Sequence, residues 1–154
     1  MLGDQIGEET GKVTGFRVLD AAGPRAEISI RTQGKILGHD YQGRATYSSQ
    51  IQPGGFVFGE GQGVYMTGEG MAVWKGQGTG KLNPGGGASY RGTIHFVTAT
   101  GNLAKLAGTV GAFEHNTDAN DNVVIEAVGM EMNLGGASRR SEVKRRALPT
   151  RRAG

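Results

Sequence analysis

Glycine recurs at every second residue in two stretches of this chain that otherwise favour β-strands. The two triplets are Gly59, Gly61 and Gly63, followed by Gly76, Gly78 and Gly80. Because the side chains of a strand alternate between its two faces, each triplet leaves one face bare and the other covered. Glycine weakens a flat strand, so we expect these positions to serve tight coiling, a bulge or a cavity. The pattern favours a closed barrel.

The length and composition are those of one globular, β-rich domain. The chain has 154 residues, and its 29 glycines outnumber its 4 prolines without a three-residue period. Tyrosine, valine and isoleucine recur between the glycines, which argues against collagen-like or disordered sequence. There is no cysteine, so disulfides and thiolate chemistry are excluded.

Turn-forming residues divide the chain at regular intervals, and short connections imply antiparallel neighbours. The sequence predicts eight strands, at Lys12–Leu19, Arg25–Leu37, Gly43–Ile51, Phe56–Met66, Met71–Leu82, Ser89–Thr98, Leu106–Asn116 and Val123–Met132. With no helical segment between them, they indicate an all-β, eight-stranded antiparallel up-and-down barrel. A barrel of this size is filled by side chains or holds one small ligand.

The net charge of +3 is concentrated at the C-terminus. Residues 138–154 contain seven Lys or Arg and one Glu, whereas the preceding residues are mildly acidic. We therefore divide the chain into a barrel domain, residues 1–137, and a basic tail, residues 138–154. The tail is either a solvated segment or a binding segment for an anionic partner such as nucleic acid or a phospholipid surface. We expect no nucleic-acid partner for the barrel itself.

The sequence lacks the segments that direct a chain to or across a membrane. No apolar run approaches ~18 residues, and residues 1–10 do not have the basic and apolar pattern of a signal peptide. We expect a cytoplasmic protein without membrane insertion.

Several common catalytic and cofactor patterns are missing. The glycines form neither GxGxxG nor a P-loop, and no serine lies in a GxSxG elbow. His39, His95 and His115 lie in separate segments, and they would form a metal site with Glu114 only if strand pairing brought them together. We predict no metal and no cofactor.

The strand at 56–66 carries polar residues on the face opposite its glycines. Phe58, Glu60 and Gln62 share this face, which lies either on the outside of the barrel or along a cavity. Glu60 is a candidate acid or base, and Phe58 and Gln62 are candidate substrate-binding residues.

Aromatic residues mark the next two strands. Trp74 shares its face with the second glycine triplet, so it either borders a ligand cavity or fills the space as core. Tyr90 and Phe96 share an apolar face, and Tyr90 is a candidate pocket hydroxyl. Phe113, in the following strand, is a further candidate for the pocket.

Glu114 ends an apolar row in which Leu106, Val110 and Ala112 share its phase. A carboxyl group held against apolar walls has a raised pKa and can act as a general acid or base near neutral pH. The alternative is a rim carboxylate paired with Arg91 or a lysine.

Two segments carry a family resemblance: Tyr90–Thr98, with the sequence YRGTIHFVT, and Leu106–Glu114, with the sequence LAGTVGAFE. Together with the Gly-x-Gly strands, they resemble the allene oxide cyclase barrel group, which includes dirigent-like proteins and bacterial relatives. The resemblance covers about residues 56–132. Gly108, Gly111 and Phe113 match the family pattern as structural positions, and no catalytic tyrosine, asparagine or cysteine set is matched.

This resemblance implies a calycin-like barrel with an apolar cavity, often oligomeric, and cofactor-free cyclisation or isomerisation. The leading hypothesis is therefore a barrel that binds a small hydrophobic molecule, with Glu114 or Glu60 and Tyr90 assisting the chemistry. The second is a non-catalytic, lipocalin-like carrier. The third is a structural or interaction barrel that works through its basic tail. Which face of each strand points inward decides among the candidate residues.

Overall fold

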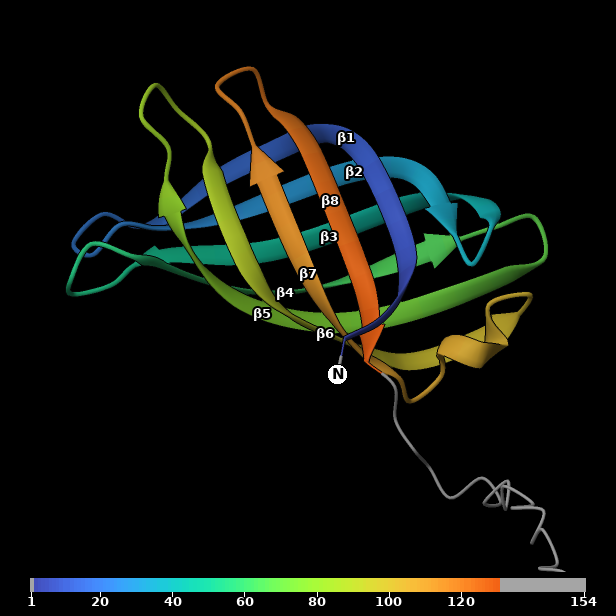
Figure 1. Ribbon diagram of the computed structural model, residues 1–154. Coiled ribbons are helices and arrows are strands. Elements are labelled where there is room, and N and C mark those ends of the chain that lie inside the picture. The colour runs from blue at the N-terminus through green and yellow to red at the C-terminus, as the bar shows by residue number, and fades with distance from the viewer. Residues whose placement is uncertain (1, 131–154) are drawn as a thin grey trace, which may run out of the picture.

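Eight antiparallel strands follow one another around a closed barrel in the computed structural model, which describes residues 2–130 (Figure 1). The strands are β1 (Leu2–Asp20), β2 (Arg25–Ile36), β3 (His39–Ile51), β4 (Val57–Met66), β5 (Gly70–Leu82), β6 (Ala88–Gly101), β7 (Val110–Thr117) and β8 (Asn122–Met130). Each strand pairs with its neighbours in the chain, and β8 pairs with β1 to close the ring. The predicted up-and-down barrel is confirmed. The basic tail at 138–154 and the preceding residues 131–137 lie outside the described residues.

Three strands begin four or more residues from their predicted starts, and one of them is β3, which begins at His39 instead of Gly43. β1 begins at Leu2 instead of Lys12, and β7 begins at Val110 instead of Leu106. The first half of β1 is rich in glycine and acidic residues, and it is held by pairing on both sides, to β2 and to β8. Before β7, a short 3-10 helix, η1 (Ala104–Leu106), occupies part of the predicted strand.

The bare glycine faces of β4 and β5 point into the barrel. On β4, Val57 and Tyr65 flank the first glycine triplet and are buried with it in phase. The missing side chains leave room for aromatic rings from other positions. A Cβ added at Gly63 would lie 2.5 Å from Cζ2 of Trp74, and one added at Gly59 would lie 3.2 Å from Cε1 of Tyr90.

One end of the barrel is closed by its own chain. The β6–β7 connection carries η1, and it buries Leu103 and Leu106 against Phe96, which is fully buried. Ile36 and Tyr41 belong to the same cluster. In Figure 1 this connection lies at the lower right, at the same end of the barrel as the N-terminus. We call this end the closed end.

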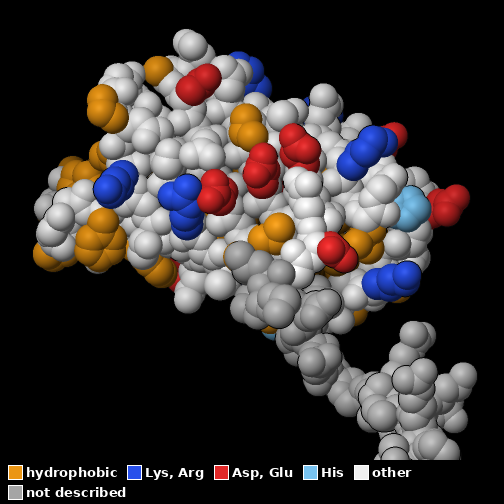
Figure 2. Space-filling view, viewed as in Figure 1, with side chains coloured by type: hydrophobic (Ala, Val, Ile, Leu, Met, Phe, Trp, Pro, Cys, Tyr) orange, Lys and Arg blue, Asp and Glu red, His pale blue; other side chains and the backbone are white. Residues whose placement is uncertain are grey.

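The opposite end carries four tight connections, at residues 21–24, 52–56, 83–87 and 118–121. They join β1 to β2, β3 to β4, β5 to β6 and β7 to β8, and they appear on the left and at the top in Figure 1. Large apolar side chains are exposed here, among them Phe16, Val18 and Leu82. Figure 2 shows hydrophobic side chains gathered along the left edge of this view. We call this end the open end.

No helix among the described residues has the length and apolar character needed to cross a bilayer.

Candidate functional site

The open end contains a cavity of about 420 Å³, which we call the mouth. Its wall is mainly apolar, with Phe16, Val18 and Leu82 at the rim and Ile28 and Val57 deeper. The rim side chains of Phe16, Val18 and Leu82 are 68%, 65% and 57% exposed. Cavities that hold small molecules commonly measure about 300 to 1,000 Å³ and are lined mainly by apolar groups. The mouth therefore has the size and lining of a small-molecule site.

Two tyrosines form the boundary between the mouth and the barrel interior. Tyr47 on β3 and Tyr90 on β6 line both the mouth and a second cavity beneath it, and their ring centroids lie 6.1 Å apart. The hydroxyl groups of Tyr90 and Ser49 share a hydrogen bond of 2.5 Å. This bond fixes the Tyr90 ring across the barrel between β6 and β3.

The second cavity, which we call the inner chamber, measures about 60 Å³. It is bordered by Trp74, Phe113, His115 and Glu9, and glycines of β4 and β5 form part of its wall. The His115 ring lies 5.3 Å from the Tyr47 ring and 5.9 Å from the Tyr90 ring, measured between centroids. The chamber is large enough for a water molecule or a small functional group, and too small for a whole substrate molecule.

Two residues that border the inner chamber each have a buried nitrogen without a hydrogen-bond partner among the described residues: Trp74 at Nε1 and His115 at Nε2. Buried polar groups are nearly always paired, so each unpaired atom calls for an explanation such as a ligand or a water. Burial lowers the pKa of His115 to about 4, so its imidazole is neutral at pH 7. The indole N–H can only donate, and a neutral imidazole donates through one ring nitrogen and accepts through the other.

Glu9 is the one buried carboxyl group among residues 2–130, with 5% of its surface exposed. It lies on β1, and the Tyr65 hydroxyl donates a hydrogen bond of 2.8 Å to its Oε1. Burial raises the pKa of Glu9 above its ordinary value, an effect that the hydroxyl groups of Thr32, Tyr65 and Tyr41 partly oppose. A carboxyl group in this setting can give or take a proton closer to neutral pH than an exposed one.

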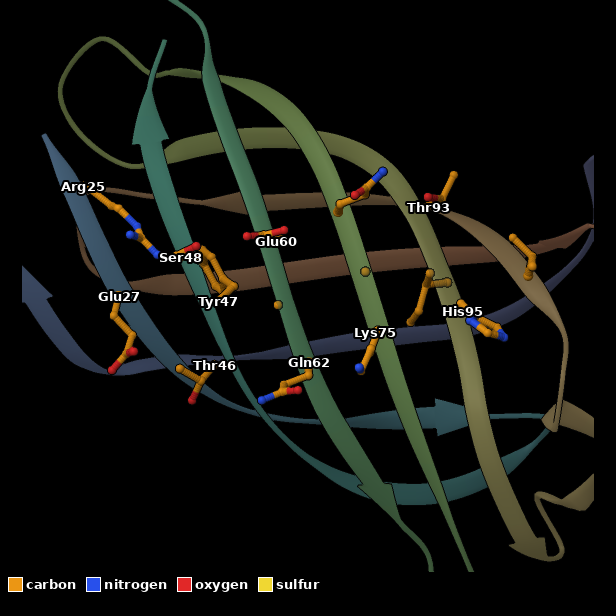
Figure 3. A pocket seen from close by; sticks show the side chains of 15 residues that line it. Arg25, Glu27, Thr46, Tyr47, Ser48, Glu60, Gln62, Lys75, Thr93 and His95 are labelled. Carbon is orange, nitrogen blue, oxygen red and sulfur yellow. The ribbon is translucent and has the colours of Figure 1, made fainter. Parts of the chain in front are cut away.

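The outer wall carries a polar groove of about 570 Å³ that holds two of the predicted site residues. Figure 3 shows Glu60 and Gln62 on β4 beside Lys75 on β5, with His95 further along on β6. All four side chains are exposed. Of the two placements that the sequence leaves open for Glu60 and Gln62, the structure shows the outer one, because the bare face of β4 points inward and turns the covered face to the outside.

Glu114 also lies on the outer wall. Its Oε1 accepts a hydrogen bond of 2.8 Å from Nε of Arg91, and its side chain is 50% exposed. The interpretation of Glu114 as an acid held against apolar walls is therefore wrong, and the alternative of a pair with Arg91 is correct. The reason is local: η1 and Gly108, whose φ is 76°, break the strand, so the burial of Leu106 does not fix the phase of β7.

The predicted aromatic residues fall into three places. Trp74, Tyr90 and Phe113 border the inner chamber. Phe96 is fully buried in the closed-end core. Phe58 is half-buried on the outer face of β4, in phase with Glu60. The first three residues are thus brought together, and the expected pocket role of Phe58 and Phe96 does not match their position.

Sequence reasoning missed Glu9, Tyr47 and Tyr65. A signal for Glu9 was present, because Gly7, Glu9, Gly11 and Val13 alternate with exposed polar residues as a half-buried strand does. The two tyrosines share the inward phase of their strands. His115 was considered only as a metal ligand, and no group of three or more His, Asp or Glu suited to a metal is found within residues 2–130.

The chain matches no protein-family model, no curated protein and no solved structure. The fold and the geometry of the two cavities are therefore the basis for a functional assignment, and the resemblance to allene oxide cyclase barrels stays a prediction.

Proposed function

We propose that this barrel binds a small hydrophobic molecule in its mouth. The observation that carries the proposal is the apolar cavity of about 420 Å³ whose rim side chains, Phe16, Val18 and Leu82, are largely exposed. Exposed apolar side chains that gather around a cavity commonly mark a binding site. Their burial by a ligand would remove apolar surface from water, which is the main driving force of such binding.

Binding is tested with N-phenyl-1-naphthylamine, an uncharged apolar dye whose emission rises in apolar surroundings. Ala26, which lines the mouth, is changed to Phe, and exposed Ala104 on η1 is changed to Phe as the matched control. We expect the full chain and A104F to bind the dye with similar affinity, and A26F to bind it at least about tenfold more weakly. Equal affinity of the two variants would place the dye elsewhere and contradict the proposal.

Native mass spectrometry of the purified full chain supplies a second test. A retained small-molecule adduct supports the proposal and identifies a class of ligand. The same spectra report the oligomeric state. The spectra could instead show an oligomer without a bound small molecule. If the association constant of that oligomer falls in Phe16→Ala, the exposed rim is a contact between copies of this chain.

A second candidate function is cofactor-independent cyclisation or isomerisation of the bound molecule. Glu9 favours it, because it is a buried carboxyl group that borders the inner chamber and its pKa is raised by burial. A molecule held in one conformation beside such a group needs only a single proton transfer. In an enzyme, Glu9→Gln would abolish turnover and change ligand affinity by no more than a few-fold. Unchanged turnover in Glu9→Gln would contradict the catalytic role of Glu9, and a non-catalytic carrier would remain as the function.

A further inference from the structure

The mouth and the inner chamber together have the form expected for a molecule with one apolar part and one polar end. The mouth offers an apolar wall, and the chamber beneath Tyr47 and Tyr90 is bordered by Trp74 and His115, whose Nε1 and Nε2 are buried without a partner among the described residues. A space of about 60 Å³ suits a functional group of two or three heavy atoms. The two tyrosines, which line both cavities, lie at the boundary between them.

The charges around both cavities disfavour an anionic ligand. Within residues 2–130, no Lys or Arg lines the inner chamber, where Glu9 is the acidic group with a buried side chain. The mouth is lined by Arg25 together with Asp118 and Asp121. The Asn122 side chain and backbone amides hold Asp118 in its ionised form and keep its pKa below the ordinary value. A carboxylate would have to lose its hydration in the chamber without a cation to replace it.

The donor at Trp74 favours a hydrogen-bond acceptor. An indole N–H has no accepting capacity, so a ligand oxygen with a free lone pair, as in a ketone, aldehyde, ester or alcohol, is the complement it lacks. Neutral His115 can add a second hydrogen bond as donor or acceptor, according to its tautomer. An unpaired buried donor is costly, so a ligand that pairs it gains affinity over one that does not.

We infer that the ligand is an uncharged apolar molecule with one hydrogen-bonding oxygen, which enters the inner chamber and accepts a hydrogen bond from Nε1 of Trp74. Fatty-acid anions and plain hydrocarbons are the disfavoured classes. This inference rests on the proposed function, since it assigns the polar end of the molecule whose apolar part occupies the mouth.

The test compares four compounds of equal chain length: 2-decanone, 1-decanol, decanoate at pH 7.5 and decane. Each displaces N-phenyl-1-naphthylamine from the full chain, and Trp74 fluorescence is recorded in parallel because it is the single tryptophan. We expect 2-decanone to bind about tenfold or more tightly than decane and decanoate, which corresponds to one added hydrogen bond. Its binding should also shift the Trp74 emission.

Variants separate the head-group contacts from general stability. Trp74→Phe keeps an aromatic ring and removes the donor, and His115→Phe removes the second unpaired atom. His95→Phe, an exposed histidine on the outer wall, is the matched control. Trp74→Phe should reduce the preference for 2-decanone over decane to within about twofold, His115→Phe should reduce it in part, and H95F should leave it unchanged.

Each outcome decides the inference. Equal affinity of 2-decanone and decane in the unaltered chain overturns it, whether or not the variants fold. Tighter binding of decanoate that is lost in Arg25→Gln also overturns it, and assigns the mouth to an anionic ligand at its rim. In both cases a ligand is bound and the proposed function stands. If the dye binds and none of the four compounds displaces it, the inference is overturned and the comparison of A26F with A104F decides the proposed function. If the dye itself does not bind, the proposed function fails as well.

Discussion

At the closed end, the β6–β7 connection packs Leu103 and Leu106 into the barrel, whereas at the open end tight turns leave Phe16 and Leu82 exposed to solvent. Apolar side chains are therefore buried at one end of the barrel and exposed at the other. Those of the closed end are removed from water by folding alone and stabilise the fold. Those of the open end remain in water after folding, so they contribute little to stability until something covers them. The difference separates the residues that hold the barrel together from those available for binding.

The largest expected effect tests this separation directly. Phe96→Ala, in the closed-end core, should lower the free energy of unfolding by about 3 to 5 kcal/mol because it leaves a large cavity. Phe16→Ala should change it by less than about 0.5 kcal/mol and should weaken dye binding instead. Urea denaturation followed by circular dichroism measures the first quantity. Similar losses in both variants would show that the open end is part of the folding core.

The second effect is a pH dependence of stability that comes from His115, which lies in the half of the interior nearer the open end. His115 has a pKa of about 4 in the folded protein against 6.5 ordinarily, so the unfolded chain takes up the proton first as the pH falls. Stability should therefore be full above about pH 6.5 and fall between pH 6.5 and pH 4, with a limiting slope of about 1.4 kcal/mol per pH unit. His115→Gln should remove this slope in urea titrations at several pH values, and exposed His95→Gln should leave it.

Glu9 lies among side chains of the closed-end half, and its effect on the pH dependence of stability should have the opposite sign to that of His115. Its pKa is raised in the folded protein, so the folded state holds the proton more tightly than the unfolded state. The contribution is present below the unfolded pKa of 4.5 and is lost as the pH rises through the raised folded value. Glu9→Gln should therefore gain stability relative to the unaltered chain as the pH rises. A constant difference at all pH values would show that Glu9 has the same pKa in both states.

A smaller effect is expected where the two halves of the interior meet. Gly63→Ala would place its Cβ against the Trp74 indole, and the displaced ring should cost about 1 to 3 kcal/mol of stability and shift the Trp74 emission. Gly68→Ala, in the β4–β5 turn, has open space around it and serves as the control. Equal effects of both variants would mean that the glycine faces do not make room for aromatic rings.

The smallest effect is expected on the outer wall. Glu114→Gln removes an exposed pair with Arg91, so the midpoint of thermal unfolding should move by no more than about 3 °C. Dye affinity should stay within about twofold. A large loss of dye affinity without a loss of stability would show that Glu114 is part of the binding site.

The sequence was sufficient to predict the barrel, because turn residues and alternation are local features. It was not sufficient to assign the inward face of β4, where the side chains that fill the space above the glycines come from Tyr90 and Trp74 on other strands. Alternation with period two shows that Phe58 and Glu60 share a face, and it leaves open which face is inside. That choice depends on packing between strands distant in the sequence.

The candidate acid was missed for a related reason. Glu9 lies in a segment rich in glycine and acidic residues, which has low intrinsic preference for a strand, and its burial comes from pairing with both Gly34 and Ile125. The alternation favours Glu114 because apolar Leu106 lies an even number of residues before it, but Gly108, with its positive φ, interrupts that phase. In both cases long-range pairing or a single break in the backbone overrides a correct local pattern.

The pairing of β1 with β8 also has a consequence for the order in which the molecule is made. Of the eight strands, β1 leaves the ribosome first and β8 last, and Glu9 pairs with Ile125 where the two strands meet. Until residues 122–130 emerge, the edges of β1 and β7 that pair with β8 have no partner, and such edges readily pair with other chains. A nascent chain stopped before Asn122 should therefore be bound by a chaperone such as trigger factor more strongly than the complete chain. Closure of this barrel therefore joins the first of its eight strands to the last.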